Sequence, residues 1–246
     1  MSTQLLFYEQ VTPISTKRHA DWSVETGGNY DFARSVNSVP LTAVEIPLAA
    51  REYTIVFAGD KEGVMPLVVL GIEGKTNLYV DSSGKWEARY VPAFVRRYPF
   101  VFARSEDGNT FTLCIDENYV GCNQEGRGQK LFDDEGGRTL FLENVLGFLQ
   151  EYQNHFRRTR AYCQKLQDLD LLEPMQAQFN LASGEQRSLT GFMAVNRERL
   201  KGLSPEALSE LAKTDELELT YAHLQSMNNF SSMLERVAKT ESPPKA

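Results

Sequence analysis

The sequence predicts an α+β fold, in which a curved antiparallel β-sheet is braced by one long helix and packs against a smaller C-terminal α/β unit. Three observations support this prediction. Short apolar, β-branched runs alternate with turn residues as far as residue 115, one apolar stripe of helical spacing follows, and two more strand-like runs precede the last helices. We expect an N-terminal β-rich region with an irregular arm (1–138), a linking helix (139–172), a C-terminal α/β unit (173–240) and a disordered tail (241–246).

The β-rich region contains five strand-like runs. Each is rich in apolar or β-branched residues, and turn signals such as Gly59-Asp60 and Glu73-Gly74 separate them. Pro92 and Pro99 bracket a short helix, because proline suits the first turn of a helix and stops its continuation. The predicted elements are strands at residues 53–58, 66–72, 78–80, 100–104 and 110–115, and short helices at residues 42–50 and 93–98.

A single long helix is predicted over residues 139–169. The residues of its inner stripe recur at spacings of three and four, which places them on one face of a helix. They are Phe141, Val145, Phe148, Tyr152, Phe156, Thr159, Cys163 and Leu166. A helix of this length is expected to pack across a sheet or to join two parts of the molecule.

Beyond residue 173 the pattern predicts a hairpin followed by helices. Ser204, Pro205 and Glu206 form a helix start, with an N-cap, a proline at the first helical position and an early acid. Asn196 is a candidate N-cap for the helix before it. The predicted elements are strands at residues 175–181 and 189–195 and helices at residues 196–200, 204–213 and 217–237.

Composition excludes several classes of protein. The chain has 246 residues and a formal net charge of −7, which argues against a nucleic-acid partner because phosphate contacts need a basic face. No stretch approaches the ~20 apolar residues of a membrane span, and the N-terminus lacks the basic and apolar regions of a signal peptide. Three cysteines without CxxC spacing suit a reducing compartment. We therefore expect a cytoplasmic protein.

The segment from Tyr90 to Phe100 carries two consecutive arginines among aromatic residues and between two prolines. A guanidinium is planar, permanently charged and able to stack on rings, so such a pair is either a scaffold or a reader of anionic groups. A scaffold pair would lock nearby loops through acids such as Asp116, whereas a reader would hold a carboxylate by bidentate bonds. The candidate ligand- or partner-binding residues are Arg96, Arg97, Tyr90, Tyr98, Trp86 and His223.

The sequence contains no GxSxG, P-loop or GxGxxG motif, and we predict no catalytic residue, no metal site and no cofactor. One metal-like spacing is present: His19-Ala20-Asp21 has the HxD pattern of a non-haem iron site, which needs a distal histidine. The other two histidines, His155 and His223, fall on predicted helices, whereas oxygenase folds supply these ligands from a β-barrel. The alternative interpretation of His19 and Asp21 is an ordinary polar loop.

Several segments occur together in an order that is typical of one family. They are Val39-Pro40-Leu41, Leu70-Gly71, Gly84-Lys85-Trp86, Leu131-Phe132-Asp133, Gly191-Phe192 and, as the most specific part, the Tyr90–Phe100 segment. On these segments the chain resembles the bacterial SapC family over nearly its whole length. The resemblance implies a protein without an export signal, although the family name derives from a surface-layer locus. It implies no catalytic residues.

Three functional hypotheses follow. The first is a non-enzymatic cytoplasmic accessory or binding protein that recognises a small anionic ligand or a protein partner near Arg96 and Arg97. The second is an iron-dependent oxygenase-like enzyme that uses His19 and Asp21. The third is a surface-layer or export-associated structural protein, as the family name suggests. We favour the first because the arginine segment is the most distinctive feature of the sequence.

Overall fold

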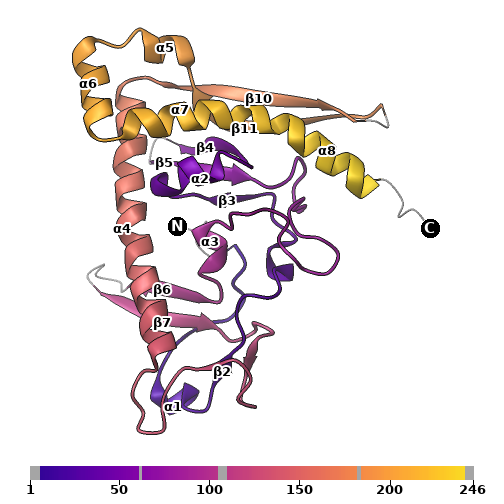
Figure 1. Cartoon of the computed structure of the whole chain (residues 1–246), viewed down its shortest axis with the longest axis vertical. Helices are drawn as coiled ribbons and strands as arrows, with labels where there is room; N and C mark the ends of the chain where they lie inside the picture. Colours follow the sequence, from indigo (N-terminus) through magenta and orange to yellow (C-terminus); the bar gives the residue numbers. More distant parts are fainter. Residues whose placement is uncertain (1–5, 61–62, 105–109, 182–183, 242–246) are drawn as a thin grey trace.

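The computed structural model describes residues 6–60, 63–104, 110–181 and 184–241. Over these residues the protein is elongated, and helix α4 (Leu140–Asp168) runs along most of its length (Figure 1). Its 29 residues correspond to about 44 Å of helix. Thr139 caps the helix by accepting a hydrogen bond from the N–H of Leu142. The predicted long helix is therefore confirmed.

Five antiparallel strands form the main sheet, in the order β10-β11-β4-β5-β3. Helix α4 packs against β5, and β11 meets β4 where Met193 lies opposite Phe57. The predicted division of the chain at residue 173 thus passes through one sheet. The bounds are β3 (Ser38–Pro40), β4 (Thr54–Asp60), β5 (Gly63–Val69), β10 (Leu172–Asn180) and β11 (Gln186–Val195).

The other end of α4 packs against a smaller sheet of order β1-β7-β6. The ring centroids of Phe100 on β6 and Phe141 on α4 lie 5.9 Å apart. Part of the arm that we predicted to be irregular forms strands here: β1 joins this sheet, and β2 pairs with both β8 and β9 of the connection between β7 and α4. The bounds are β1 (Val11–Pro13), β2 (Ser23–Val24), β6 (Phe100–Arg104), β7 (Phe111–Asp116), β8 (Cys122–Asn123) and β9 (Gln129–Lys130).

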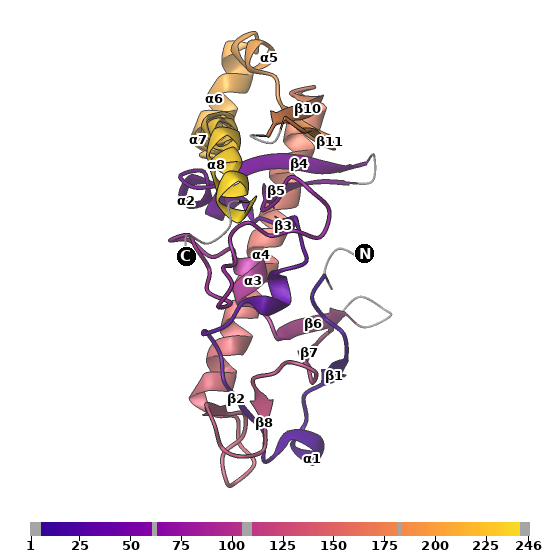
Figure 2. The ribbon, with the colours of Figure 1, turned by 90° about the vertical axis from the view of Figure 1, so that its right-hand side faces the viewer.

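The C-terminal helices follow the hairpin of β10 and β11, and both views show α7 and α8 running beside it (Figures 1 and 2). Asn196 and Ser204 cap α5 and α6 as predicted, each through its side-chain oxygen. The single helix predicted over residues 217–237 is wrong, because the turn η4 (Met227–Asn229) separates α7 from α8. The bounds are α5 (Arg197–Lys201), α6 (Pro205–Lys213), α7 (Glu216–Ser226) and α8 (Phe230–Glu241).

A tertiary contact explains this break between the helices. The side-chain amide of Asn229 donates to the carbonyl oxygens of Ala50 and Tyr53, both at 2.8 Å. Backbone carbonyls that need a partner thus fix the position of η4. Of the predicted tail, residues 242–246 lie outside the described residues, and Glu241 is the last residue of α8.

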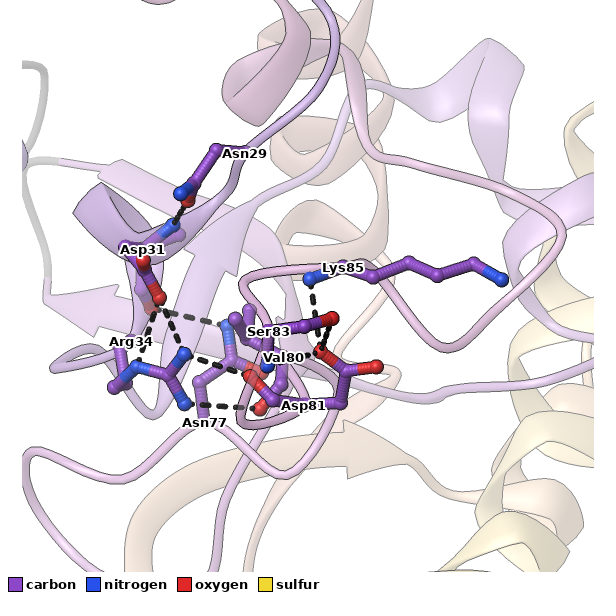
Figure 3. A network of polar contacts seen from close by, with 9 residues as sticks. Asn29, Asp31, Arg34, Asn77, Val80, Asp81, Ser83 and Lys85 are labelled. Carbon is purple, nitrogen blue, oxygen red and sulfur yellow. Dashed lines mark hydrogen bonds and ion pairs between the residues drawn. The ribbon is translucent and has the colours of Figure 1, made fainter. Parts of the chain in front are cut away.

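The strand predicted at residues 78–80 is also wrong, since only an isolated bridge joins Val80 to Trp86. The N–H of Tyr79 instead donates to the side-chain oxygen of Asn77. Arg34 secures this loop, because its guanidinium donates to the carboxylate of Asp31 and to the carbonyl oxygens of Val80 and Asp81 (Figure 3).

The short helices predicted before β4 and after Pro92 are confirmed as η3 (Ala43–Glu45) with α2 (Ile46–Ala49), and as α3 (Ala93–Arg96). The arm adds α1 (Thr16–His19) and η2 (Asp31–Ala33). The predicted α+β fold, with antiparallel sheets braced by α4, is therefore confirmed. None of the helices in the described part of the chain combines the length and apolar character of a membrane-spanning segment.

Truncation of a buried side chain on α4 tests the packing of this helix. Leu166 is fully buried, so we expect Leu166→Ala to lower the free energy of unfolding by about 2–5 kcal/mol through lost burial and the cavity it leaves. Leu140, at the other end of the same helix, is 77% exposed, and Leu140→Ala is the matched control with little effect. Urea unfolding measures both, and equal losses would contradict the packing described.

Candidate functional site

The candidate site begins with α3, a single turn that ends at Arg96 and is followed directly by Arg97. Successive residues of a helix point about 100° apart, so two consecutive arginines do not share one direction. Arg97, directly after the helix, is buried and 2% exposed, whereas Arg96 is exposed. The structure therefore separates the pair into an inner and an outer guanidinium.

Arg97 lies in a cage of aromatic rings. Its Cζ atom is 4.1 Å from the ring centroid of Phe94, 5.1 Å from that of Tyr152 and 5.8 Å from that of Tyr8. Burial raises the pKa of Tyr152 to about 12, while the Arg97 charge acts in the opposite direction. These rings come from α3, from α4 and from the N-terminal arm, so Arg97 joins three segments as a scaffold element does.

Arg96 lies on the outside of the same turn, between the rings of Tyr90 and Phe148. Its Cζ atom is 5.2 Å from the centroid of Phe148 and 5.9 Å from that of Tyr90. Its Nε donates to the carbonyl oxygen of Val91 at 3.0 Å. No acidic side chain in the described part of the chain forms an ion pair with it. We call Tyr90, Arg96 and Phe148 the Arg96 surface.

A buried carboxylate, Glu45, positions Tyr90. One Glu45 oxygen accepts from the Tyr90 hydroxyl and from the N–H of Ala93, both at 2.7 Å. The other accepts from the N–H and hydroxyl of Thr42 at 2.8 and 2.7 Å. Burial raises the pKa of Tyr90 and the Glu45 charge raises it further, so the phenol stays protonated and remains a donor.

Trp86 is buried and Tyr98 is half-buried. The indole Nε1 of Trp86 donates to the Tyr53 hydroxyl at 2.7 Å, and Trp86 is 5% exposed. The ring of Tyr98 stacks on Phe32 with centroids 4.2 Å apart, and its hydroxyl donates to the Asp116 carboxylate at 3.3 Å. Both residues support the segments around α3, and of the six predicted residues only Arg96 and Tyr90 share the Arg96 surface.

His223 lies apart from the arginine segment, in the core between α7 and the main sheet. Its Nε2 accepts from the N–H of Val195 at 3.1 Å, and its ring meets the edge of Phe57 with centroids 4.9 Å apart. Because Nε2 is an acceptor, the proton of the neutral ring is on Nδ1. Burial lowers the pKa of His223 to about 4. The residue therefore acts as a neutral core contact.

His19 and Asp21 do not converge. His19 is fully buried, with Nε2 3.0 Å from the Glu117 carboxylate and Nδ1 accepting from the N–H of Ser15 at 3.3 Å, whereas Asp21 is exposed. Both ring nitrogens of His19 are thus engaged within the protein. The described residues contain no group of three or more histidine, cysteine or acidic side chains placed to hold a metal ion.

The three cysteines are free thiols. Cys114 and Cys163 are buried, as expected from their places on the apolar faces of a strand and a helix. Burial raises the pKa of Cys163 to about 12, and burial together with the nearby Asp116 and Glu117 charges does the same for Cys122. A raised pKa keeps both thiols protonated and weakly nucleophilic at neutral pH.

Sequence reasoning missed two residues of the site, Glu45 and Phe148. Thr42 and Glu45 form a capping box, and the Ser/Thr-x-x-Glu spacing that predicts one is visible in the sequence. Phe148 belongs to the predicted inner stripe of α4. The periodicity of this stripe did not indicate that the Phe148 ring is half exposed and contacts the guanidinium of Arg96.

The comparisons with known proteins identify a family alone. A family model described as SapC matches residues 14–233 of the chain. No curated protein and no solved structure has significant similarity to it.

The two arginines are expected to respond differently to truncation. Arg97→Ala removes a desolvated guanidinium from three rings, and we expect a loss of at least about 2 kcal/mol in the free energy of unfolding. Arg96→Ala removes an exposed stacking contact, and we expect a loss of about 0.5–1 kcal/mol. Thermal and urea unfolding of both variants measure this difference, and an Arg97→Ala protein as stable as Arg96→Ala would contradict the scaffold role.

The lowered pKa of His223 predicts a pH-dependent stability. In the unfolded chain His223 takes up a proton near pH 6.5, whereas in the folded protein it stays neutral down to about pH 4. The free energy of unfolding therefore has its full value above pH 6.5. It falls as the pH decreases, by about 3 kcal/mol in total at 1.36 kcal/mol per pKa unit. In His223→Gln this contribution is absent, so the stability gap between the wild type and the variant should narrow from pH 7 to pH 4.5. A gap that stays constant would show that His223 is not the group responsible.

Proposed function

We propose that this chain, which belongs to the SapC family, is a non-enzymatic cytoplasmic binding protein that recognises an anionic group on the Arg96 surface. The group is a carboxylate of a small ligand or of an acidic side chain on a partner. The observation that carries the proposal is the guanidinium of Arg96, which is exposed, held between two rings and not neutralised by an acid in the described residues.

The geometry of Arg96 supports recognition of a planar anion. Its Nε already donates to the Val91 carbonyl oxygen, and cation–π contacts with Phe148 and Tyr90 further limit the positions of the guanidinium. A side chain held in this way loses less conformational entropy on binding than a free arginine. The terminal nitrogens provide the parallel N–H donors that a carboxylate accepts.

The formal net charge of the chain is −7, and Arg96 keeps its positive charge without an acidic partner in the described residues. Free thiols support the proposed cytoplasmic location, because disulfides persist in oxidising compartments. No feature of the described residues supports the oxygenase or the surface-layer hypothesis in the way that Arg96 supports the binding hypothesis.

Binding to a cell extract tests the proposal. Immobilised wild-type protein is compared with Arg96→Ala and Arg96→Lys, and the captured metabolites and proteins are quantified by mass spectrometry. We expect at least one species to be lost about tenfold in both variants, since lysine keeps the charge but not the planar fork.

Arg157→Ala is the matched control. Arg157 is also exposed, but its guanidinium contacts the side chain of Asn154 on its own helix rather than an aromatic pair. The control should capture the same species as the wild type. Identical capture by all four proteins would overturn the proposal, and so would a loss that occurs equally in the control.

A further inference from the structure

A second feature lies away from the Arg96 surface, at the β3 edge of the main sheet. It is a pocket of about 270 Å³ between β3, β5 and the loops beside them. Its lining is half apolar and half polar, with a single charged residue. The lining residues are Leu6, Ser35, Val36, Asn37, Ser38, Pro40, Leu67 and Lys75.

Backbone hydrogen bonds fix the two walls of this pocket to each other. The carbonyl oxygen of Asn37 accepts from the N–H groups of Leu70 and Gly71 at 2.7 and 3.1 Å. At the far end of the loop, the backbone N–H of Asn77 donates to the carbonyl oxygen of Arg34. The side-chain amide of Asn77 donates to the carbonyl oxygen of Ala33, and both distances are 3.0 Å (Figure 3). The loop that carries Lys75 is thus anchored at both ends to the opposite wall.

The same loop is tightly closed, which fixes the backbone at Lys75. A Cβ on Gly71 would lie 1.9 Å from the carbonyl oxygen of Thr76, so only glycine fits there. Lys75 itself has φ of 73°, a left-handed conformation that costs energy for a residue with a side chain. The surrounding anchors hold the backbone of Lys75 in this conformation, and its exposed side chain forms part of the pocket lining.

Lys75 is also the uncompensated charge of its loop. The nearby acid, Glu73, forms an ion pair with Arg187 of β11. No ion pair joins Lys75 to an acid within the described ranges. The side-chain amide of Asn37 has one long contact there, from the Ser38 hydroxyl at 3.5 Å, so its polar atoms are available to a ligand.

We propose that this pocket binds the carboxylate of a small apolar acid. The ammonium of Lys75 and the amide of Asn37 hold the carboxylate, and Val36, Pro40 and Leu67 contact the apolar end. One cation matches the single negative charge of a carboxylate, whereas a phosphate monoester carries about −1.5 to −2 at pH 7. The volume lies below the ~300–1,000 Å³ that is typical of pockets for drug-sized ligands, which favours a short chain.

Two sources supply this chemistry: a free short-chain acid, and an apolar residue with its carboxylate at the C-terminus of a polypeptide. Titration of the wild type with 4-methylpentanoate, followed by chemical shifts of the lining residues, tests the shared chemistry. Its neutral isostere 4-methylpentanamide tests the need for charge. The tripeptide acetyl-Ala-Ala-Leu with a free carboxylate, compared with its amidated form, tests the polypeptide source.

We expect the acid to bind and the amide to bind at least about tenfold more weakly. Lys75→Gln should weaken binding of the acid by a similar factor and leave the midpoint of urea unfolding unchanged. Lys85→Gln is the matched control, because Lys85 is exposed and its ammonium points away from the polar network around Arg34 (Figure 3).

The outcomes separate the two sources. Binding of the tripeptide acid with the same dependence on Lys75 assigns the pocket to a polypeptide C-terminus, and binding of 4-methylpentanoate alone assigns it to a metabolite. The proposal is overturned if neither acid shifts the lining residues at millimolar concentration, if the amides bind as well as the acids, or if Lys75→Gln binds like the wild type. These results do not depend on Arg96, so this inference and the proposed function can fail separately.

Discussion

The buried guanidinium of Arg97 ties together three parts of the chain that are distant in sequence. A permanently charged group in the interior is costly unless rings and hydrogen-bond acceptors surround it. Phe94, Tyr152 and Tyr8 supply the rings, and they belong to α3, to α4 and to the N-terminal arm. The packing of these segments therefore depends on one side chain, and the direction of α3 follows from it. Because Arg97 points inward, the preceding arginine has to point outward.

Glu45 also fixes the position of α3, through the N–H of Ala93. A buried carboxylate needs several donors, and Glu45 has four, from Thr42, Tyr90 and Ala93. Two of these groups fix the start of α3 and the phenol beside Arg96. The Arg96 surface thus depends in part on interior contacts, since the buried Glu45 holds the Tyr90 ring and the N–H of Ala93. Such support keeps a binding group in position without a contribution from the ligand.

The sequence predicted those elements of the fold that depend on neighbouring residues, namely α4 and the hairpins. The stripe from Phe141 to Leu166 identified α4, and turn signals identified the hairpins, because periodicity and turn chemistry are properties of neighbouring residues. The break at Asn229 depends on the carbonyl oxygens of Ala50 and Tyr53, and the loop after Tyr79 depends on Arg34, so sequence windows around these elements did not contain the cause. The arginine segment was identified as distinctive. Its division into a scaffold residue and a surface residue required the direction of α3, which distant contacts set.

Electrostatics limits the class of anion that Arg96 and Lys75 would bind under the two proposals. Arg96 and Lys75 each lack an acidic partner in the described residues, yet the chain as a whole carries a net charge of −7. At physiological salt, charges more than about 8 Å apart are largely screened, so the nearest cation decides the affinity for a single carboxylate in contact with it. A polyanion extends over many such distances and meets the acidic remainder of the surface, where repulsion outweighs one favourable contact. For the two proposed sites we therefore expect anions of one charge with an apolar or planar body rather than nucleic acids.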